Sequence, residues 1–275
     1  MKLKKTIGPS IVIALLVLLY IPTGHWLFDS WLSNPYYTHG FLIPAVSGFI
    51  IWRKRRELIL AKPLNIGVVV LAVGALIYIM GSLQDIRSLT AFSFLIVLSG
   101  LILYFYGTKA MRSLAFPLAF LVFMIPPPFL DKWGFYLQFT SLHSSATLLD
   151  WMGFSVTTNG TEIALSGATF TIGIPCSGMN TLIALLALSA VFTYILSGPI
   201  YKRAILFVIA FPIAILANIL RIVSIILVAH YYNAKFATGF FHDISSPLFF
   251  LIAFLFIVLL SRLLGCKVVI GTPEK

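Results

Sequence analysis

Residues 203–231 read RAILFVIAFPIAILANILRIVSIILVAHY, and this stretch decides the fold class. It is longer than the roughly 20 residues that an α-helix needs to cross the hydrocarbon core of a bilayer. The rest of the chain has the same character, with 60% hydrophobic residues, only 10% charged residues and a mean hydropathy of +1.03. These values lie outside the range of soluble globular domains. The sequence therefore predicts an all-α polytopic membrane protein.

Further apolar runs on both sides of this stretch predict about eight transmembrane helices, with both termini in the cytoplasm. We expect these spans near residues 7–28, 38–52, 64–82, 89–108, 111–126, 177–197, 203–231 and 245–264. The first run follows three lysines, as in a signal peptide, but its length and the lack of a small-residue cleavage site favour a retained span. Internal repeats and low-complexity linkers are absent from the sequence, so we expect a single transmembrane domain over residues 1–275.

The net charge of +11 comes from basic residues that cluster in alternate short loops. Basic loops face the cytoplasm, so this pattern sets the topology in a cytoplasmic (inner) membrane and does not indicate nucleic-acid binding. The clusters are Lys2, Lys4 and Lys5; Arg53 to Arg56 with Lys62; Lys109 and Arg112; Lys202 and Arg203; and Arg262, Lys267 and Lys275.

A long stretch between the fifth and sixth predicted spans, about 127–175, belongs to the extracytoplasmic side in this topology. Its first part, 131–152, mixes apolar and polar residues as an interfacial helix does. Its second part, 154–174, alternates and contains Asn159-Gly160, which is a strong hairpin signal. We therefore expect an interfacial helix and a small β-hairpin before the sixth span.

A cysteine stands where that sixth span begins, in the sequence IPCSGMN (174–180). The dipole at a helix N-terminus favours the thiolate of Cys176, and unpaired N–H groups near Ser177 and Gly178 can hold an oxyanion. A packed, inert thiol is the alternative. Cys266 is expected at the inner side, about 30 Å away, which excludes a disulfide.

Arg221 interrupts an apolar span, where an arginine facing lipid costs on the order of 3 kcal/mol. The 18 residues from Arg203 to Arg221 correspond to about 27 Å of helix, so we expect Arg221 near the outer interface, level with Cys176. Asn218 lies three residues earlier and so on the same helix face. A snorkelling anchor is the alternative, but a polar Asn–Arg edge is more typical of a site.

His242 lies in the predicted outer loop before the last span, next to Asp243, which can orient its ring. The ordinary pKa of histidine suits general acid–base chemistry. His39 opens the second span on the same predicted side and is a further candidate. The sequence contains no close metal-ligand cluster and no glycine-rich phosphate loop, so we expect neither a metal nor a cofactor.

With these residues in view, the chain resembles the exosortase/archaeosortase family of multispanning cysteine transpeptidases. The matching pieces are, in chain order, YTHGFLIP (37–44), IPP (125–127), PCSG (175–178), ANILRI (217–222) and FHD (241–243). The resemblance implies that Cys176 is the nucleophile, Arg221 the essential arginine and His242 the third catalytic residue. It also implies membrane-anchored substrate proteins whose C-terminal sorting tail has a signature motif, one transmembrane helix and a basic end. Cleavage and transfer to an acceptor would occur on the extracytoplasmic side. No fused domain is expected after Lys275.

Two other functions fit parts of the same sequence. A transporter or assembly protein for exported polysaccharide or lipid would use Arg221 to bind an anion and would tolerate replacement of Cys176. A membrane enzyme acting on lipid or polysaccharide would share the polar outer cluster without needing a thiol at the start of a helix.

Overall fold

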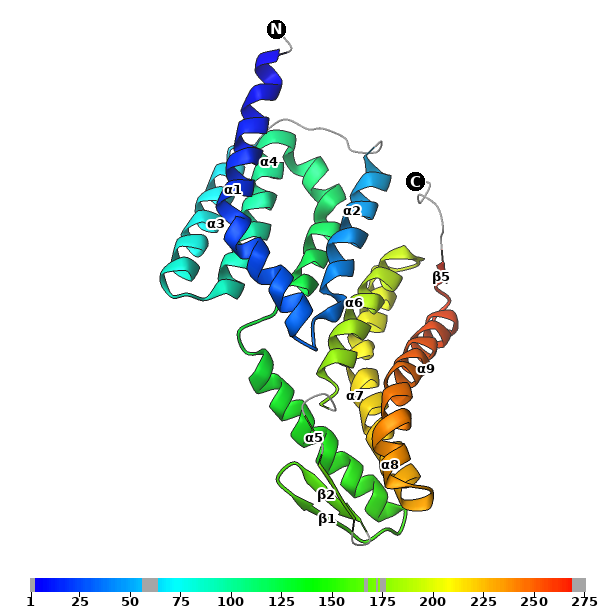
Figure 1. Ribbon diagram of the computed structural model, residues 1–275. Helices are drawn as coiled ribbons and strands as arrows, with labels where there is room; N and C mark the ends of the chain where they lie inside the picture. The colour runs from blue at the N-terminus through cyan, green and yellow to red at the C-terminus, as the bar shows by residue number, and fades with distance from the viewer. Residues whose placement is uncertain (1–2, 56–63, 166–167, 172, 174–176, 269–275) are drawn as a thin grey trace. The chain divides into compact units, whose positions relative to one another are not determined.

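The computed structural model describes residues 3–55, 64–165, 168–171, 173 and 177–268, and these are mostly helical (Figure 1). The chain divides into two compact units, residues 1–128 and 129–275. The expectation of a single domain over the whole chain stays a prediction.

The first unit is built from four α-helices and two short 3₁₀ turns among its described residues. They are α1 (Leu3–Ser33), η1 (Thr38–Phe41), α2 (Leu42–Lys54), α3 (Ile66–Leu83), α4 (Arg87–Phe120) and η2 (Leu121–Met124). The second predicted span, 38–52, therefore starts as a 3₁₀ turn and becomes an α-helix only at Leu42.

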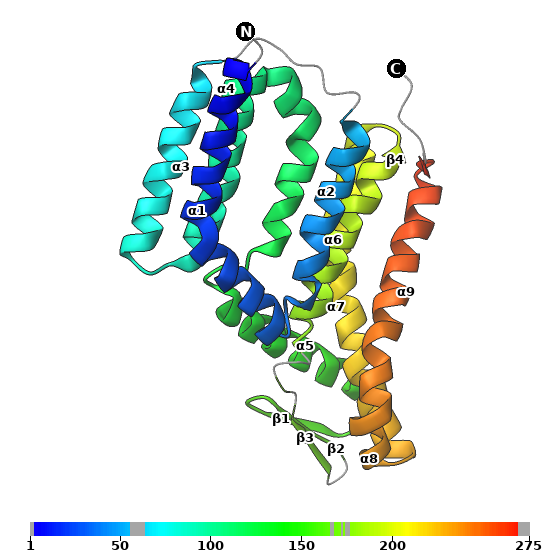
Figure 2. The same cartoon turned by 45° about the horizontal axis from the view of Figure 1, so that its top comes forward.

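Helix α4 contains both the fourth and the fifth predicted span. The chain turns back within it at Gly107, whose φ of 76° and ψ of −175° interrupt the helix (Figure 2). The sequence reading put this break at the basic residues Lys109 and Arg112, which is wrong by a few residues. Glycine adopts such a backbone conformation without the Cβ clash that another residue would have, so the turn falls on Gly107.

Helices α3 and α4 approach each other closely through glycines spaced seven residues apart. A Cβ atom on Gly67 would lie 2.5 Å from the backbone N of Tyr104, and one on Gly81 would lie 2.9 Å from the N of Thr90. Gly74 packs against Val97 between them. Small residues let transmembrane helices gain van der Waals contact along their backbones, so close backbone packing stabilises this pair.

The second unit places α7 at the centre of a helical group. Its elements are α5 (Leu130–Trp151), β1 (Val156–Asn159), β2 (Glu162–Leu165), β3 (Ala168–Thr171), α6 (Met179–Ile195), β4 (Leu196–Ser197), α7 (Ile200–Tyr231), α8 (Ala234–Phe236), the π-helical turn η4 (Ala237–Phe241), α9 (His242–Leu263) and β5 (Lys267–Val268). Helix α7 packs against α5, α6 and α9. The short strands β4 and β5 pair with each other.

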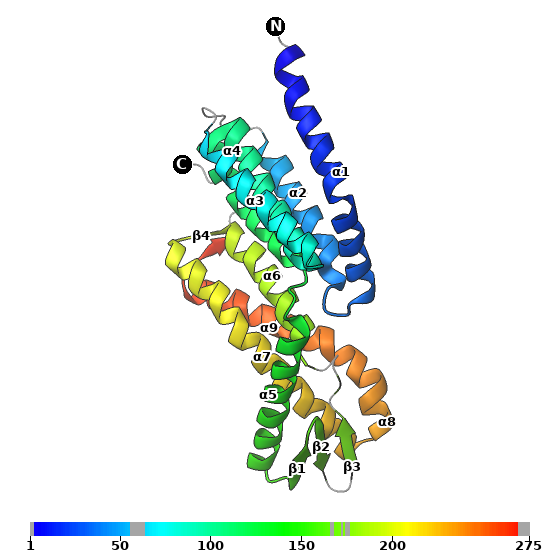
Figure 3. The ribbon, with the colours of Figure 1, turned by 90° about the vertical axis from the view of Figure 1, so that its left-hand side faces the viewer.

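An antiparallel sheet in the order β1-β2-β3 follows α5 (Figure 3). The turn between β1 and β2 contains Gly160, with a φ of 59°, next to Asn159, as the hairpin signal indicated. The sequence predicted one small hairpin within 154–174, but residues 162–165 and 168–171 form two strands, β2 and β3, so the sheet has three strands. A Ser-Gly pair in the middle of this run is itself a turn signal that the sequence reading did not use.

Four helical segments of the described residues are long and apolar enough to cross a membrane. They are Ile66–Leu83, Arg87–Met124, Ile200–Tyr231 and Ala234–Leu263. Helix α6 is apolar but shorter. The chain is therefore a multi-pass membrane protein with mostly helical structure. The number of eight spans, the cytoplasmic termini and the extracytoplasmic position of α5 and the sheet stay predictions.

Candidate functional site

Asn218 and Arg221 lie on one buried face of α7, with only 2% and 4% of their surfaces exposed. Their spacing of three residues puts them on adjacent turns of the same side of the helix. A buried guanidinium is costly unless hydrogen-bond partners surround it. Its neighbours on the adjacent helices therefore explain why α7 tolerates an arginine.

Arg221 makes two side-chain contacts with the start of α9, which packs beside α7 (Figure 1). Its Nη2 lies 3.2 Å from Nε2 of His242, and its Nε donates to Oγ of Ser245 at 3.2 Å. Ser245 is fully buried and donates in turn to the backbone oxygen of His242 at 2.9 Å. The arginine is therefore held by two α9 residues that are three positions apart, and so on one helix face.

The contact with Arg221 determines the tautomer of His242. A guanidinium has only donors, so Nε2 of the imidazole must accept the hydrogen bond. The neutral ring then carries its hydrogen on Nδ1, which donates to Oδ1 of Asp243 at 3.4 Å. The side chain of Asp243 is 84% exposed, so water screens this contact.

The local backbone places His242 at the first position of α9, whereas the sequence reading placed it in a loop. The turn η4 precedes it, and Gly239 within that turn has non-helical angles of φ −99° and ψ −106°. This bend redirects the chain between α8 and α9. Ser245, one turn into α9, was missed because a serine in an apolar run carries no signal of its own. Its spacing of three residues from His242 was the available clue.

Gly178, at the start of α6, packs directly against Asn218. Its φ is 81°, and a Cβ atom at this position would lie 2.6 Å from Cγ of Asn218. Both the backbone angle and the close approach therefore require glycine. Ser177 is buried, and its Oγ accepts a hydrogen bond from the N–H of Met179 at 3.3 Å. Cys176 lies outside the described residues.

Two serines of helix α5 form hydrogen bonds with the same face of α7. Nδ2 of Asn218 donates to Oγ of Ser141 at 3.1 Å, and Oγ of Ser145 donates to the backbone oxygen of Ile219 at 3.3 Å. Both serines are buried. The sequence predicted an interfacial helix over 131–152 and assigned no role to the serines and threonines of 140–147. Their spacing of four residues would have indicated a polar face toward a partner helix.

His39 belongs to the first unit, in η1, so its predicted place in the site stays a prediction. Its ring stacks on that of Tyr37 with a centroid distance of 5.5 Å. Both ring nitrogens are buried and have no hydrogen-bond partner among the described residues.

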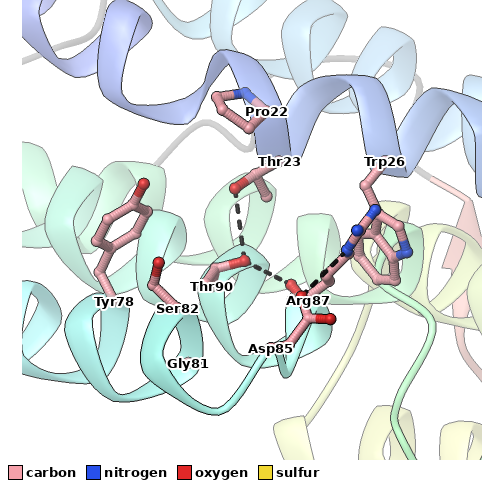
Figure 4. Close-up of a pocket in the computed structure, with 9 residues that line it drawn as sticks. All are labelled: Pro22, Thr23, Trp26, Tyr78, Gly81, Ser82, Asp85, Arg87 and Thr90. Atoms are coloured by element: carbon pink, nitrogen blue, oxygen red, sulfur yellow. Dashed lines mark hydrogen bonds and ion pairs between the residues drawn. The ribbon is translucent and has the colours of Figure 1, made fainter.

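A cavity of about 250 Å³ lies in the first unit between α1, α3 and α4 (Figure 4). The hydroxyl of Thr23 donates to that of Thr90 at 3.4 Å at its wall, and Arg87 pairs with Asp85 at 3.5 Å at its edge. Both charged side chains are well exposed. None of the residues singled out from the sequence lines this cavity.

The second unit therefore brings the Arg221 guanidinium and the His242 imidazole together, and one turn earlier on α7 it packs the buried amide of Asn218 against Gly178. Guanidinium N–H groups can stabilise an oxyanion, and an imidazole can transfer a proton. In the part of the chain that the structure describes, no three His, Cys, Asp or Glu side chains are grouped as metal ligands would be.

One comparison with known proteins gives a match. A family model described as transmembrane exosortase matches residues 31–259, which is most of the chain and includes every candidate residue named above. Comparisons with curated proteins and with solved structures give no match.

Proposed function

Since the chain belongs to the transmembrane exosortase family, we propose that it is a membrane-embedded cysteine transpeptidase. Its substrates are secreted proteins anchored by a C-terminal sorting tail, which consists of a signature motif, a transmembrane helix and a basic end. The enzyme cleaves this tail through a thioester and passes the protein to an acceptor. The catalytic residues are Cys176, Arg221 and His242.

The observation that carries this proposal is the packing of Gly178 against the polar face of α7. Two residues of chain span at most about 7 Å, so the Cα of Cys176 is no farther than that from the Cα of Gly178. Gly178 contacts Asn218, and Arg221 lies one turn along the same face. This packing supports a site in which the Cys176 thiol, the Arg221 guanidinium and the His242 imidazole lie close together.

Each step of the reaction has a matching group. The Cys176 thiolate attacks the scissile carbonyl and forms a tetrahedral oxyanion, which the N–H donors of Arg221 stabilise. Collapse breaks the C–N bond, so the substrate becomes a thioester on the enzyme and its tail leaves as an amine. An amine of the acceptor then attacks the thioester, restores an amide bond and releases the thiol. Water in place of the amine would release a carboxylic acid.

His242 carries the proton between these steps. Its neutral form has the lone pair on Nε2. This lone pair exchanges the hydrogen bond from Arg221 for the proton of the Cys176 thiol, which frees the Arg221 donor for the oxyanion. The resulting imidazolium donates this proton to the departing amine. An imidazolium next to the guanidinium of Arg221 is unfavourable, and the negative oxyanion formed in the same step offsets that repulsion.

The charge distribution of the second unit supports an extracytoplasmic site. Nζ of Lys202 donates to the backbone oxygen of Leu264 at 2.8 Å, so basic residues gather where α7 begins and α9 ends. Helix α7 rises about 27 Å from Arg203 to Arg221. Basic residues face the cytoplasm, so we infer that the polar face of α7 opens to the other side.

The test replaces Cys176 with alanine and follows a co-expressed protein that ends in the three-part sorting tail. We expect uncleaved substrate at an unchanged level of the enzyme. Cys266→Ala is the matched control because Cys266 is a buried thiol in the same unit, beyond the end of α9. Normal processing by Cys176→Ala would overturn the proposal and favour the transporter or assembly function.

A further inference from the structure

Strand β3 is an edge of the three-stranded sheet. Its one partner among the described residues is β2, through the register Glu162↔Thr171 to Leu165↔Ala168. Helix α5 contacts β1 and β2 and covers one face of the sheet, where its Leu142 and Leu149 pack with Ile163 and Leu165. An edge strand presents a row of unpaired backbone groups that can hold a further strand.

The register determines which groups of β3 face this open edge. Two residues, Gly160 and Thr161, separate the paired residues Asn159 and Glu162. In such a two-residue hairpin the flanking pair exchanges both backbone hydrogen bonds, and the bonding pairs then alternate along the strands. Glu162 and Ala164 therefore bond to β1, while Ile163 and Leu165 bond to β3.

It follows that Phe170 and Ala168, the partners of Ile163 and Leu165, point their backbone groups toward β2. Thr169 and Thr171 point theirs toward the open edge. Leu165 and Ala168 also pair with two residues of sequence between them, which requires the same assignment. The side chains of both threonines are exposed, so they do not fold back into the core of the unit.

The sheet is anchored next to the proposed catalytic arginine. Ile163 and Leu165 are buried in one cluster with Ile222 and Ile226 of α7, and Phe170 packs against this cluster. Ile222 directly follows Arg221 in the sequence. The edge of β3 is therefore held in a fixed position relative to the arginine by well-packed side chains.

The proposed nucleophile is also close to this edge along the sequence. Cys176 follows Thr171 by five residues, which span at most about 18 Å. A peptide of five or six residues in extended form covers that distance. A strand added to β3 could thus be continuous with a peptide bond that lies at Cys176.

We propose that β3 binds the substrate by strand addition: the extended segment of the sorting tail beside the scissile bond pairs with the backbone of Thr169 and Thr171. This inference rests on the proposed function and defines how that function selects its substrate. Main-chain hydrogen bonds supply the affinity in strand addition. The recognised element is therefore an extended, unfolded segment, which a sorting motif just outside a transmembrane helix provides.

The first test compares two prolines on opposite edges of the sheet. Thr169→Pro removes a backbone N–H that points to the open edge of β3. Thr158→Pro removes the equivalent N–H of β1. Thr158 pairs with Ile163 without backbone hydrogen bonds between the two residues, so its N–H points away from β2. Proline is tolerated at edge positions whose N–H does not bond within the sheet. We expect kcat/KM for tail cleavage to fall about three- to tenfold in Thr169→Pro alone, with the increase mainly in KM.

The second test removes donors from the substrate and leaves the enzyme intact. The probe is a synthetic peptide with the sequence of a sorting tail encoded in the same genome, N-methylated at one amide at a time. We expect cleavage by the full-length enzyme in detergent to fall at every second position, because a strand bonds to one neighbour through alternate residues. This test stays decisive if Thr169→Pro unfolds in a thermal melt.

The outcomes separate this inference from the proposed function. Equal activity of the two proline variants, or an N-methyl scan without two-residue periodicity, would overturn strand addition while Cys176→Ala remained inactive. Processing by Cys176→Ala would instead overturn the proposed function. Self-association lost in Thr169→Pro, without a change in KM, would show that the edge pairs with a second copy and not with substrate.

Discussion

Two helix pairs of this protein are packed by opposite means. Helices α3 and α4 approach through Gly67, Gly74 and Gly81, where even a Cβ atom would collide with the neighbouring helix. Helices α7 and α9 meet through Arg221 and Ser245, whose hydrogen bond lies in the interior. Apolar surface gains little from burial against another helix in lipid, so shape alone can hold the first pair. A buried guanidinium is not needed for packing, and its presence makes the second pair the candidate site.

Replacing Arg221 should have the largest effect on activity. Arg221→Ala removes the donors proposed to stabilise the oxyanion and leaves Nε2 of His242 without this partner. We expect kcat to fall by about 10³-fold, which is the size of effect seen when an oxyanion donor is lost. Arg221→Lys keeps the charge but cannot bond to His242 and Ser245 with one planar group, so it should recover only part of the activity.

Arg262→Ala is the matched control for that measurement, because Arg262 is an exposed arginine at the far end of α9. Single-turnover cleavage of a tail peptide, measured together with the melting temperature, separates lost chemistry from lost folding. Full activity of Arg221→Ala would mean that α7 and α9 are joined for structural reasons, as α3 and α4 are.

Replacing Gly178 should have the next largest effect on activity. This residue combines a close approach that only glycine allows with contact to a buried polar side chain, that of Asn218. Gly178→Ala introduces a side chain at a φ of 81° and pushes against Asn218. A displacement of about 1 Å near reacting groups can reduce the rate by about 10²-fold. Gly153→Ala has the same backbone problem, with a φ of 90°, but no atom lies within 4 Å of the new Cβ.

We therefore expect Gly178→Ala to lose activity and Gly153→Ala to lose only stability, by about 1–2 kcal/mol for a left-handed residue. Cleavage rate per folded protein is the quantity to compare. Equal rates in the two variants would show that the contact between Gly178 and Asn218 does not position the catalytic thiol.

The position of Arg221 along its helix could be predicted from the sequence, whereas the direction of each helix face could not. A helix rises by a constant 1.5 Å per residue, so counting from Arg203 was enough to expect Arg221 near the outer end of its span, on the same predicted side as His242. The structure places Arg221 and His242 within 3.2 Å of each other. Which residues surround them depends on how the helices rotate about their axes, and Ser141 and Ser245 were missed for that reason.

The close packing of α3 on α4 was missed for a related cause. Glycines spaced by seven residues form one stripe on a helix, but a stripe predicts a contact only once the partner helix is known. The turn at Gly107 depended on a single glycine within an apolar run. Its positive φ belongs to local backbone geometry, which hydrophobic patterning does not record.

Gly67 should give the smallest effect on activity and a clear effect on stability. A Cβ at this position would lie 2.5 Å from the N of Tyr104 and 2.8 Å from the O of Gly100, and backbone atoms cannot move aside as side chains can. We expect Gly67→Ala to separate α3 from α4 and to lower stability by about 1–3 kcal/mol, the usual range for overpacking.

Gly48→Ala is the matched control for Gly67→Ala, and we expect it to change stability in the opposite direction. Gly48 lies in α2 and is exposed, and no atom lies within 4 Å of the place that a Cβ would take there. Alanine there should stabilise the helix by up to about 1 kcal/mol. Thermal unfolding in detergent measures the change in stability of both variants. Cleavage per folded molecule should stay unchanged in both. A loss of cleavage in folded Gly67→Ala would mean that the glycine-packed pair also serves the reaction, which would remove the distinction between the two helix pairs.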